Sequence, residues 1–368
     1  MKFICSRERL MEAISIVQKA VATRSTLPIL DGILIEANEG AGLKLTGYDL
    51  ETGIECQVEA DVPESGSLVI NARMFGDIVR KLPEDIVSIE NTGNLSVTID
   101  SGSSHFSIKG IRADDYPKIP TVEESARLNM KQNELKDLIR QTIFAVSTDE
   151  SRPVLNGCCF VSDGKTVEMV AIDGFRLALR RAESETPLPE MKFIIPGKAL
   201  NEVGRILQSI DAPVDIYPSQ NHIMFDTGRV KLVSRLIQGD YMNYKSIIPQ
   251  TVETTVLISP KAMLDAVERA ALVISSEERR FPVRLATPDP DTLVVSANTD
   301  IGTLREEISI SMTGNKIDID FNPRYFLDAL KVIDDEQISI VFNGSMGPCV
   351  LKPVESQEFA YLVLPLRR

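Results

Sequence analysis

The chain has 368 residues, of which 43% are apolar and 25% are charged, and its formal net charge is −13. These proportions are those of ordinary globular proteins and exclude a disordered class. No apolar run is long enough to cross a bilayer, which excludes a membrane-spanning class. The negative total disfavours nucleic-acid binding unless the 40 basic residues gather on one surface.

Two further features of the composition restrict the chemistry and the location. The five cysteines form no CxxC pair, and His105 and His222 stand in no metal-ligand spacing. We therefore expect reduced, buried thiols and no zinc site. The opening MKFICSRERL has charges where a signal peptide needs its apolar core. We expect a cytoplasmic protein.

The chain repeats itself. Residues 106–120 and 231–249 each read as an alternating strand, an Asp-Tyr pair and a proline, and their tyrosines, Tyr116 and Tyr241, lie 125 residues apart. The same offset relates the prolines of STLPIL and SRPVLNG, and a third, slightly slipped copy ends at the carboxyl terminus. Self-similarity of this length indicates whole domains, not a solenoid. We expect domains at residues 1–122, 129–250 and 253–368.

Each repeat combines two helices with many short strands. In the first repeat Leu10, Ile14, Val17 and Val21 recur at helical spacing after Ser6, a good capping residue. Short β-like runs such as ILIEA and IECQVEA follow, separated by Gly, Asp or Asn. The pattern predicts an α+β fold in which two helices pack on an antiparallel sheet in each repeat. The expected helices are residues 7–24, 72–82, 133–146, 197–210, 259–274 and 322–333.

The second helix of every repeat has the same charge pattern, a cation, then an acid four residues on, then a cation three further. Positions i, i+4 and i+7 share one helix face, so each helix has one charged stripe. The stripes are either ordinary solvated faces with ion pairs, or a positive surface for a polyanion. Because the helices are mildly cationic and the remainder strongly anionic, the second interpretation gains weight, for contacts to phosphates without base recognition. The stripe residues are Arg73, Asp77, Arg80; Lys198, Glu202, Arg205; Arg324, Asp328, Lys331.

The sequence carries no familiar catalytic signature. It has no GxxxxGK[ST], no GxGxxG after a strand and no GxSxG. Asp114 and Asp115 form either a metal pair or, more simply, the start of a turn. Asp173, Arg176 and Tyr241 would make a small active site, but no nucleophile or general base accompanies them. We predict no catalytic, cofactor or metal residue, and hence not an enzyme.

Several motifs resemble one family. They are the opening MKF, TLPIL at 26–30, LTGYDLE at 45–51, LNG at 155–157, AIDGFRLAL at 171–179 and the terminal YLVLPLRR. Together they closely resemble the bacterial DNA sliding clamps, the beta subunits of DNA polymerase III. The resemblance implies a head-to-tail ring dimer of three clamp domains per chain, with helices inside and sheets outside. It implies encircled duplex DNA, a clamp-loader ATPase and tethered replicative and repair polymerases as partners, with no membrane.

The resemblance also implies three sets of site residues. A peptide pocket for partner proteins maps onto Leu155, Ile172, Gly174, Phe175, Arg176, Leu177, Met242, Ile247, Met346, Pro348, Val363, Leu364, Pro365, Leu366 and Arg367. DNA contacts map onto Arg24, Arg73, Arg152, Lys198, Arg205, Arg279 and Arg280. The dimer interface maps onto Phe106 and Ile108 against Leu272 and Val273.

The sequence departs from the family at the pocket. Family members often have His where Phe175 stands, and Met-Pro-Met where this chain has Leu364, Pro365 and Leu366. These changes keep the pocket apolar, and the sequence does not decide which peptides it prefers. Two other functions stay open on the residues alone, a peptide-binding scaffold without DNA and an enzyme of unrecognised type.

Overall fold

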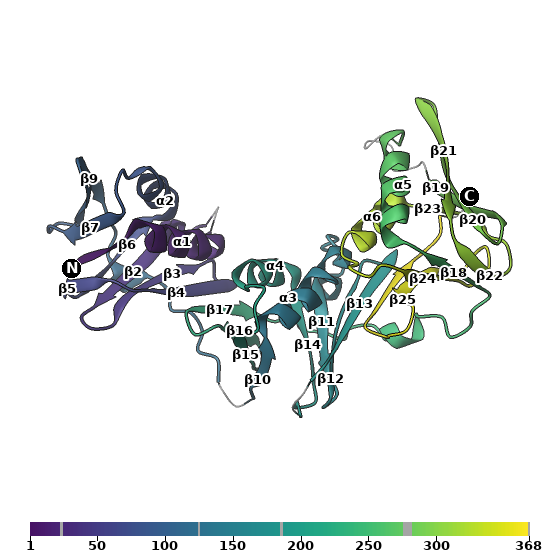
Figure 1. The fold of residues 1–368 in the computed structure, drawn as a ribbon. Helices are drawn as coiled ribbons and strands as arrows, with labels where there is room; N and C mark the ends of the chain where they lie inside the picture. Colours follow the sequence, from purple (N-terminus) through teal and green to yellow (C-terminus); the bar gives the residue numbers. More distant parts are fainter. Residues whose placement is uncertain (23–24, 124–125, 185–186, 275–281, 367–368) are drawn as a thin grey trace. The chain divides into compact units, whose positions relative to one another are not determined.

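The structure is a computed structural model, and it describes residues 1–22, 25–123, 126–184, 187–274 and 282–366. The described residues form two compact units. One contains residues 1–133 and 202–236, and the other contains residues 134–201 and 237–368. Each unit holds two antiparallel sheets with helices packed against them (Figure 1).

The first unit has a five-stranded and an eight-stranded sheet. In spatial order the smaller sheet is β5 (Asp61–Glu64), β1 (Lys2–Ser6), β7 (Ile86–Asn91), β8 (Ser96–Ser101) and β9 (Ser104–Lys109). The larger is β10 (Leu128–Lys131), β15 (Pro213–Pro218), β16 (His222–Asp226), β17 (Val230–Arg235), β4 (Thr52–Val58), β3 (Gly42–Tyr48), β2 (Gly32–Asn38) and β6 (Gly66–Asn71). In β1 and β8 buried residues alternate with partly buried ones, as one fully buried sheet face requires.

The second unit has a nine-stranded and a four-stranded sheet. The larger sheet runs β14 (Met191–Pro196), β11 (Gly157–Ser162), β12 (Thr166–Ile172), β13 (Arg176–Glu183), β26 (Phe359–Val363), β25 (Cys349–Pro353), β24 (Ile338–Phe342), β18 (Thr254–Ile258) and β22 (Ser311–Gly314). The smaller runs β21 (Gly302–Ser309), β20 (Thr292–Thr299), β19 (Val283–Asp289) and β23 (Asp318–Phe321).

The repeats share their sheets. β17, the closing strand of the second repeat, pairs antiparallel with β4 of the first. β26, the closing strand of the third, pairs in the same way with β13 of the second. The second repeat therefore contributes strands to both units, because its two sheets continue into its two neighbours.

All six predicted helices form, and each ends earlier than the periodicity suggested. α1 stops at Val17, Gln18–Ala20 is a 3-10 turn, and Val21 is extended, so the prediction that Val21 belongs to the helix is wrong. The end of α1 approaches β3 so closely that a Cβ on Gly47 would lie 2.2 Å from the carbonyl oxygen of Val17. The helices are α1 (Arg7–Val17), α2 (Ala72–Lys81), α3 (Gln132–Arg140), α4 (Gly197–Ile206), α5 (Pro260–Leu272) and α6 (Pro323–Leu330).

The repeated tyrosines have equivalent places. The Tyr116 hydroxyl donates to the carbonyl oxygen of Thr46 (3.4 Å), and the Tyr241 hydroxyl donates to that of Val170 (3.3 Å). Thr46 and Val170 lie in the corresponding strands β3 and β12, so each Asp-Tyr turn is tied to its own sheet in the same way. The predicted state of the cysteines is confirmed, since all five are free and buried. Burial raises the pKa of the Cys159 thiol to about 11, which makes it unreactive.

Candidate functional site

The largest group of candidate residues lies where β13 meets β26. The two strands pair with Arg176 opposite Val363 and Leu177 opposite Leu362. Beyond the last pair, the backbone N–H of Leu364 donates to the carbonyl oxygen of Phe175 over 2.9 Å. Sequence positions almost 190 residues apart are thus side by side, because a closing strand of one repeat extends the sheet of another.

A buried apolar core lies beneath this junction. Leu155, Ile172 and Leu177 pack there with Tyr241 and Leu362, and Ile247 is partly buried against them. Val363 is also buried. These candidate residues are therefore part of the buried core and are not themselves exposed to a partner.

Five other apolar side chains are exposed beside that core. β13, β26 and β25 are adjacent and antiparallel. Phe175 precedes β13, Leu364 and Leu366 follow β26, and Met346 precedes β25, so all four lie at the same end of the three strands. Met242 follows Tyr241 of the core. We call Phe175, Met242, Met346, Leu364 and Leu366 the strand-end surface. The side chain of Phe175 is 60% exposed and that of Met346 is 75% exposed. A group of large apolar side chains exposed to water in this way is typical of a binding surface.

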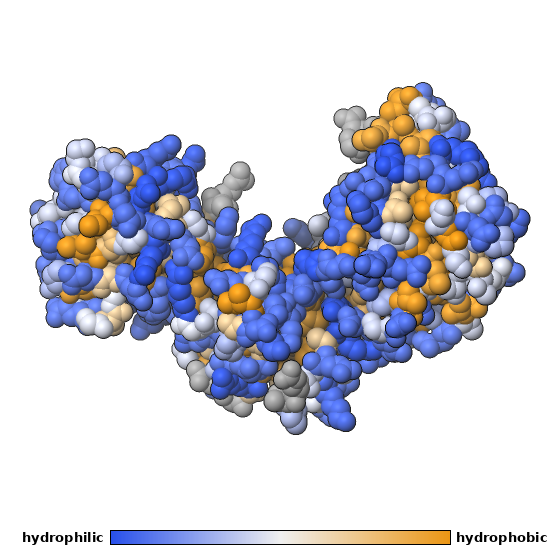
Figure 2. Space-filling view, in the orientation of Figure 1, coloured by the Kyte–Doolittle hydropathy of each residue, from blue (hydrophilic) through white to orange (hydrophobic). Residues whose placement is uncertain are grey.

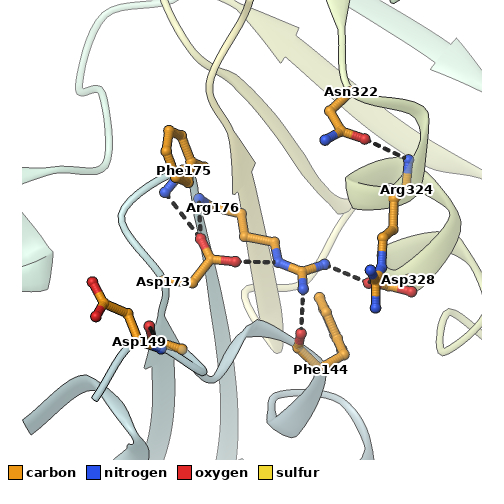
Figure 3. A network of polar contacts seen from close by, with 9 residues as sticks. Phe144, Asp149, Asp173, Phe175, Arg176, Asn322, Arg324 and Asp328 are labelled. Carbon is orange, nitrogen blue, oxygen red and sulfur yellow. Dashed lines mark hydrogen bonds and ion pairs between the residues drawn. The ribbon is translucent and has the colours of Figure 1, made fainter. Parts of the chain in front are cut away.

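The turn that presents Phe175 is built from its own residues (Figure 3). One oxygen of the Asp173 carboxylate accepts the backbone N–H groups of Phe175 (2.9 Å) and Arg176 (3.0 Å). Gly174 has a φ of +95°, which glycine adopts without strain. The turn therefore holds Phe175 outward without help from a ligand.

Arg176, a candidate pocket residue, is only 9% exposed, and each of its guanidinium nitrogens makes a hydrogen bond inside the protein (Figure 3). Its Nε donates to Asp173 (2.8 Å), one terminal nitrogen to Asp328 (2.6 Å), and the other to the carbonyl oxygen of Phe144 (2.6 Å). The guanidinium also lies 4.8 Å from the centre of the Tyr325 ring and 5.6 Å from that of Phe144.

A second buried network anchors the segment that carries Met242 and Ile247. Glu168 of β12 accepts the hydroxyl of Tyr244 (2.5 Å) and pairs with Arg181 (2.5 Å) and Lys245 (3.4 Å). Burial acts to raise the pKa of Glu168, but these hydrogen bonds and positive charges outweigh it and hold the pKa below its ordinary value.

The cations of the helix stripes are exposed, whereas Glu202 and Asp328 are partly buried. The opposite faces are apolar and buried, as with Phe75 and Val79 on α2. In each stripe the acid pairs with a cation. Arg80 contacts Asp77 at 2.8 Å, Arg205 contacts Glu202 at 2.6 Å, and Arg324 lies 3.9 Å from Asp328. The ion pairs of the ordinary solvated face are thus present. With two cations to one acid, the residues of each stripe carry a formal charge of one positive unit, although Lys331 also pairs with Glu268 of α5 at 3.2 Å.

The predicted DNA contacts are only partly described. Arg73, Arg152, Lys198 and Arg205 are exposed. Arg24, Arg279 and Arg280, and Arg367 of the pocket set, lie outside the described residues.

The candidate dimer residues lie at two sheet edges. Phe106 and Ile108 are on β9, the edge strand of the five-stranded sheet. Phe106 also lines a groove of about 480 Å³ with Arg73, Met74, Asp77 and Ile78 of α2. In the other unit Leu272 is 80% exposed at the end of α5, and Figure 2 shows hydrophobic residues over that end. Val273, next to it, accepts a hydrogen bond from Thr299 (2.8 Å), close to the start of β21.

Sequence reasoning missed part of the site. The Tyr325 ring stacks on that of Phe175, with ring centres 6.3 Å apart, and it also lies against the guanidinium of Arg176. The charge pattern assigns Asp328 only to the α6 stripe, although its closest cation is Arg176. No sequence signal marked these pairings, because they join repeats along a path that no single motif spans.

The structure assembles no reactive centre from these residues. Asp173 and Arg176 neutralise each other, and the Tyr241 hydroxyl is buried and donates to a backbone carbonyl. Asp114 pairs with Arg112 in a short 3-10 turn. Among the described residues no cluster of His, Cys, Asp or Glu is arranged to hold a metal ion, and no helix is both long and apolar enough to cross a membrane.

Three tandem α+β repeats that share sheets, exposed cations on the helices and an apolar strand-end surface define a protein of the clamp class. The comparisons place it more closely. Models of the DNA polymerase III beta subunit match in order, with the N-terminal domain at residues 1–120, the central domain at 129–243 and the C-terminal domain at 245–367.

Relatives and solved structures agree with this match. The beta sliding clamps of Bacillus subtilis and Halalkalibacterium halodurans are 36% and 37% identical, with all of each chain covered. The structure of the Bacillus subtilis polymerase sliding clamp superimposes with a TM-score of 0.95 at 35% identity, covering 100% of this chain and 99% of that one. The Pseudomonas aeruginosa clamp bound to griselimycin gives 0.93 at 30%, covering both chains fully.

The chain therefore belongs to the DNA polymerase III beta subunit family, the bacterial sliding clamps. It is a polymerase processivity factor and a non-catalytic subunit, and the predicted fold class, three tandem clamp domains, is confirmed. Nothing in the comparisons favours a scaffold that acts without DNA.

Proposed function

We propose that two copies of this chain close head to tail into a ring around duplex DNA. A clamp-loader ATPase places the ring, which then tethers replicative and repair polymerases through the strand-end surface. The observation that carries the proposal is a strand-pairing rule within the chain that the third repeat leaves incomplete.

The rule is that the closing strand of one repeat pairs with the outermost strand of the sheet that its neighbour contributes. β17 pairs with β4, and β26 pairs with β13. β21 occupies the corresponding place in the third repeat, and β9 is the closing strand of the first. Within the described residues both are edge strands, β21 beside β20 alone and β9 beside β8 alone. Open edges of this kind recruit a further strand. A second copy supplies the missing one at each edge.

The rule also gives a register. Equivalent turns precede the three strands, since Asp49, Asp173 and Thr299 each accept with a side-chain oxygen the N–H of the residue two positions on. By this alignment Thr52, Arg176 and Gly302 correspond. Thr52 pairs with Ser234 and Arg176 with Val363. Because Ser234 corresponds to Lys109 at the offset of 125, Gly302 should lie opposite Lys109 of the second copy, and Thr303 opposite Ile108.

Apolar contact would reinforce this edge. Leu272 is 80% exposed beside the start of β21, and the groove that Phe106 forms with Met74 and Ile78 lies beside β9. Once the strands pair, Leu272 of one copy has an apolar groove on the other to enter. Val273 would pack beneath it.

The DNA contacts proposed for the ring are electrostatic. Arg73, Lys198 and Arg205 are exposed on helix faces that carry one net positive charge per stripe. Such stripes attract phosphates of any sequence, and the attraction weakens with salt. Weak contacts suit a ring that slides, because closure prevents its escape.

The strand-end surface is the proposed partner site. Its aromatic, leucine and methionine side chains form an adaptable apolar face over a buried core. A short linear segment of a polymerase or loader subunit would bury its apolar residues there. We propose that griselimycin, bound to the Pseudomonas aeruginosa clamp, takes the same surface here.

Retention on DNA tests the ring. The protein is loaded onto a nicked circular plasmid by the purified loader ATPase of the same organism, washed in high salt, and the plasmid is then cut. We expect retention on the circle and loss on the linear form. A Leu272→Ala, Val273→Ala variant, which should not close, is the control. If the protein is washed off the circle by salt, or stays on the plasmid after it is cut, the result would contradict encirclement and favour a scaffold.

A further inference from the structure

The contacts of Arg176 assign it a role other than touching a partner peptide. We infer that Arg176 is a positioning residue which, through Asp328 and Tyr325 of α6, fixes the Phe175 turn and so shapes the strand-end surface. The inference rests on the proposed function of that surface.

The first step is that Arg176 is buried, at 9% exposure, and that each of its guanidinium nitrogens already donates to a group of the protein. Nε donates to Asp173 (2.8 Å), Nη1 donates to Asp328 (2.6 Å), and Nη2 donates to the carbonyl oxygen of Phe144 (2.6 Å). Both aromatic neighbours, Phe144 and Tyr325, cover the group within 5.6 Å. A planar fork with donors in several directions suits this task, whereas the donors of a lysine all sit on one nitrogen and could not match three separated partners in the same way.

The second step connects Arg176 to Phe175. Asp173 binds the Arg176 side chain with one carboxylate oxygen and the N–H of Phe175 with the other. Tyr325 lies under the guanidinium and stacks on the Phe175 ring at an angle of 17°. The orientation of Phe175 is therefore held on two sides by groups that Arg176 itself contacts.

The third step separates two roles on α6. Asp328 lies 2.6 Å from Arg176 but 3.9 Å from Arg324. The shorter ion pair of the Asp328 carboxylate is therefore the one with the buried Arg176, and the Arg324 side chain is 78% exposed to solvent. Removal of Asp328 should therefore affect the strand-end surface although α6 also carries a stripe proposed to face DNA.

Griselimycin is the probe, and its affinity for the full-length protein is measured by calorimetry. Arg176→Met and Asp328→Ala should each weaken binding by about tenfold. Together they should cost little more than either alone, because both break one pair. Two matched controls should stay within about twofold. Arg180→Met breaks the Arg180–Glu358 pair (2.9 Å) on the same strand, and Arg324→Ala removes a cation of the same helix.

The outcomes are distinct. If Asp328→Ala leaves the affinity unchanged while Arg176→Met lowers it, Arg176 contacts the probe directly and the inference is overturned. Additive losses would also overturn it. Equal losses in the Arg180→Met control, with equal drops in melting temperature, would reduce the effect to general destabilisation. Failure of the unmodified protein to bind griselimycin would instead reject the proposed partner surface.

Discussion

The N–H of Leu364 donates to the carbonyl oxygen of Phe175 at 2.9 Å, and the first unit repeats this bond between Arg235 and Glu51 at 3.0 Å. The two junctions share their backbone geometry but not their chemistry. Where one presents an apolar pair, the other has an ion pair, with Arg235 3.7 Å from Glu51. Of these two junctions between described residues, only the one at Phe175 and Leu364 is therefore apolar.

Replacing the apolar pair by a charged pair like that of the first unit should abolish binding at the strand-end surface. In a Phe175→Glu, Leu364→Arg variant the charges copy the Glu51–Arg235 junction, so the backbone pairing should persist. We expect griselimycin affinity to fall by about 100-fold, because binding would desolvate two charges. Calorimetry measures the affinity, and solution mass checks that the dimer remains. Affinity within a few-fold of the unmodified protein would contradict the assignment of this surface.

The proposed interface depends on the end of α5. Replacing Leu272 and Val273 by Ala should give monomers, since the apolar packing at each joint weakens by about 2 to 5 kcal/mol. Sedimentation at nanomolar concentration measures the mass. Val252→Ala, at an exposed apolar position elsewhere, is the control and should stay dimeric. A dimer in the double variant would show that the joint lies elsewhere.

The Glu168 network should make stability depend on pH in one direction. The hydrogen bonds and positive charges around Glu168 hold the pKa of its carboxyl group below the ordinary value of 4.5, against the opposing effect of burial. The stabilisation is therefore complete above that value and is lost as the pH falls through the lower, folded pKa. Glu168→Gln should lower the free energy of unfolding at pH 7, and the difference from the unmodified protein should shrink below about pH 4.5.

Urea unfolding across this pH range measures that difference. The matched control is Glu183→Gln, at an exposed glutamate that ends the neighbouring strand β13. It should change stability little at any pH. A Glu168→Gln deficit that stays constant down to pH 3 would show that shape, not charge, accounts for the effect.

The stripes should act on DNA through charge alone. In Arg73→Ala, Arg324→Ala protein, binding to short linear duplexes should weaken equally for all sequences. The slope of log affinity against log salt should fall by about 0.9 for each phosphate that the variant no longer neutralises. Fluorescence anisotropy over a salt series measures it, with Arg112→Ala as an exposed control cation. An unchanged slope would place these arginines away from the DNA.

Much of the fold follows from local pattern. The offset between Tyr116 and Tyr241, the helical spacing of Leu10, Ile14 and Val17, and the alternation in strands such as β1 are properties of short segments. Each is set by backbone geometry and by the need to bury one face. Helix ends were missed because the tightening of a last turn, as after Val17, depends on the sheet packed against it.

The sequence alone determined that this chain is three α+β repeats with charged stripes on the second helices, and its motifs pointed to the clamp family. Only the tertiary structure decided that Arg176 binds Asp328, that Tyr325 supports Phe175, and that Glu51 and Arg235 make the homologous junction polar. Those pairings join residues from different repeats, or from the two sides of a shared sheet. Their distances depend on strand register across the whole sheet, which no local pattern of residues records.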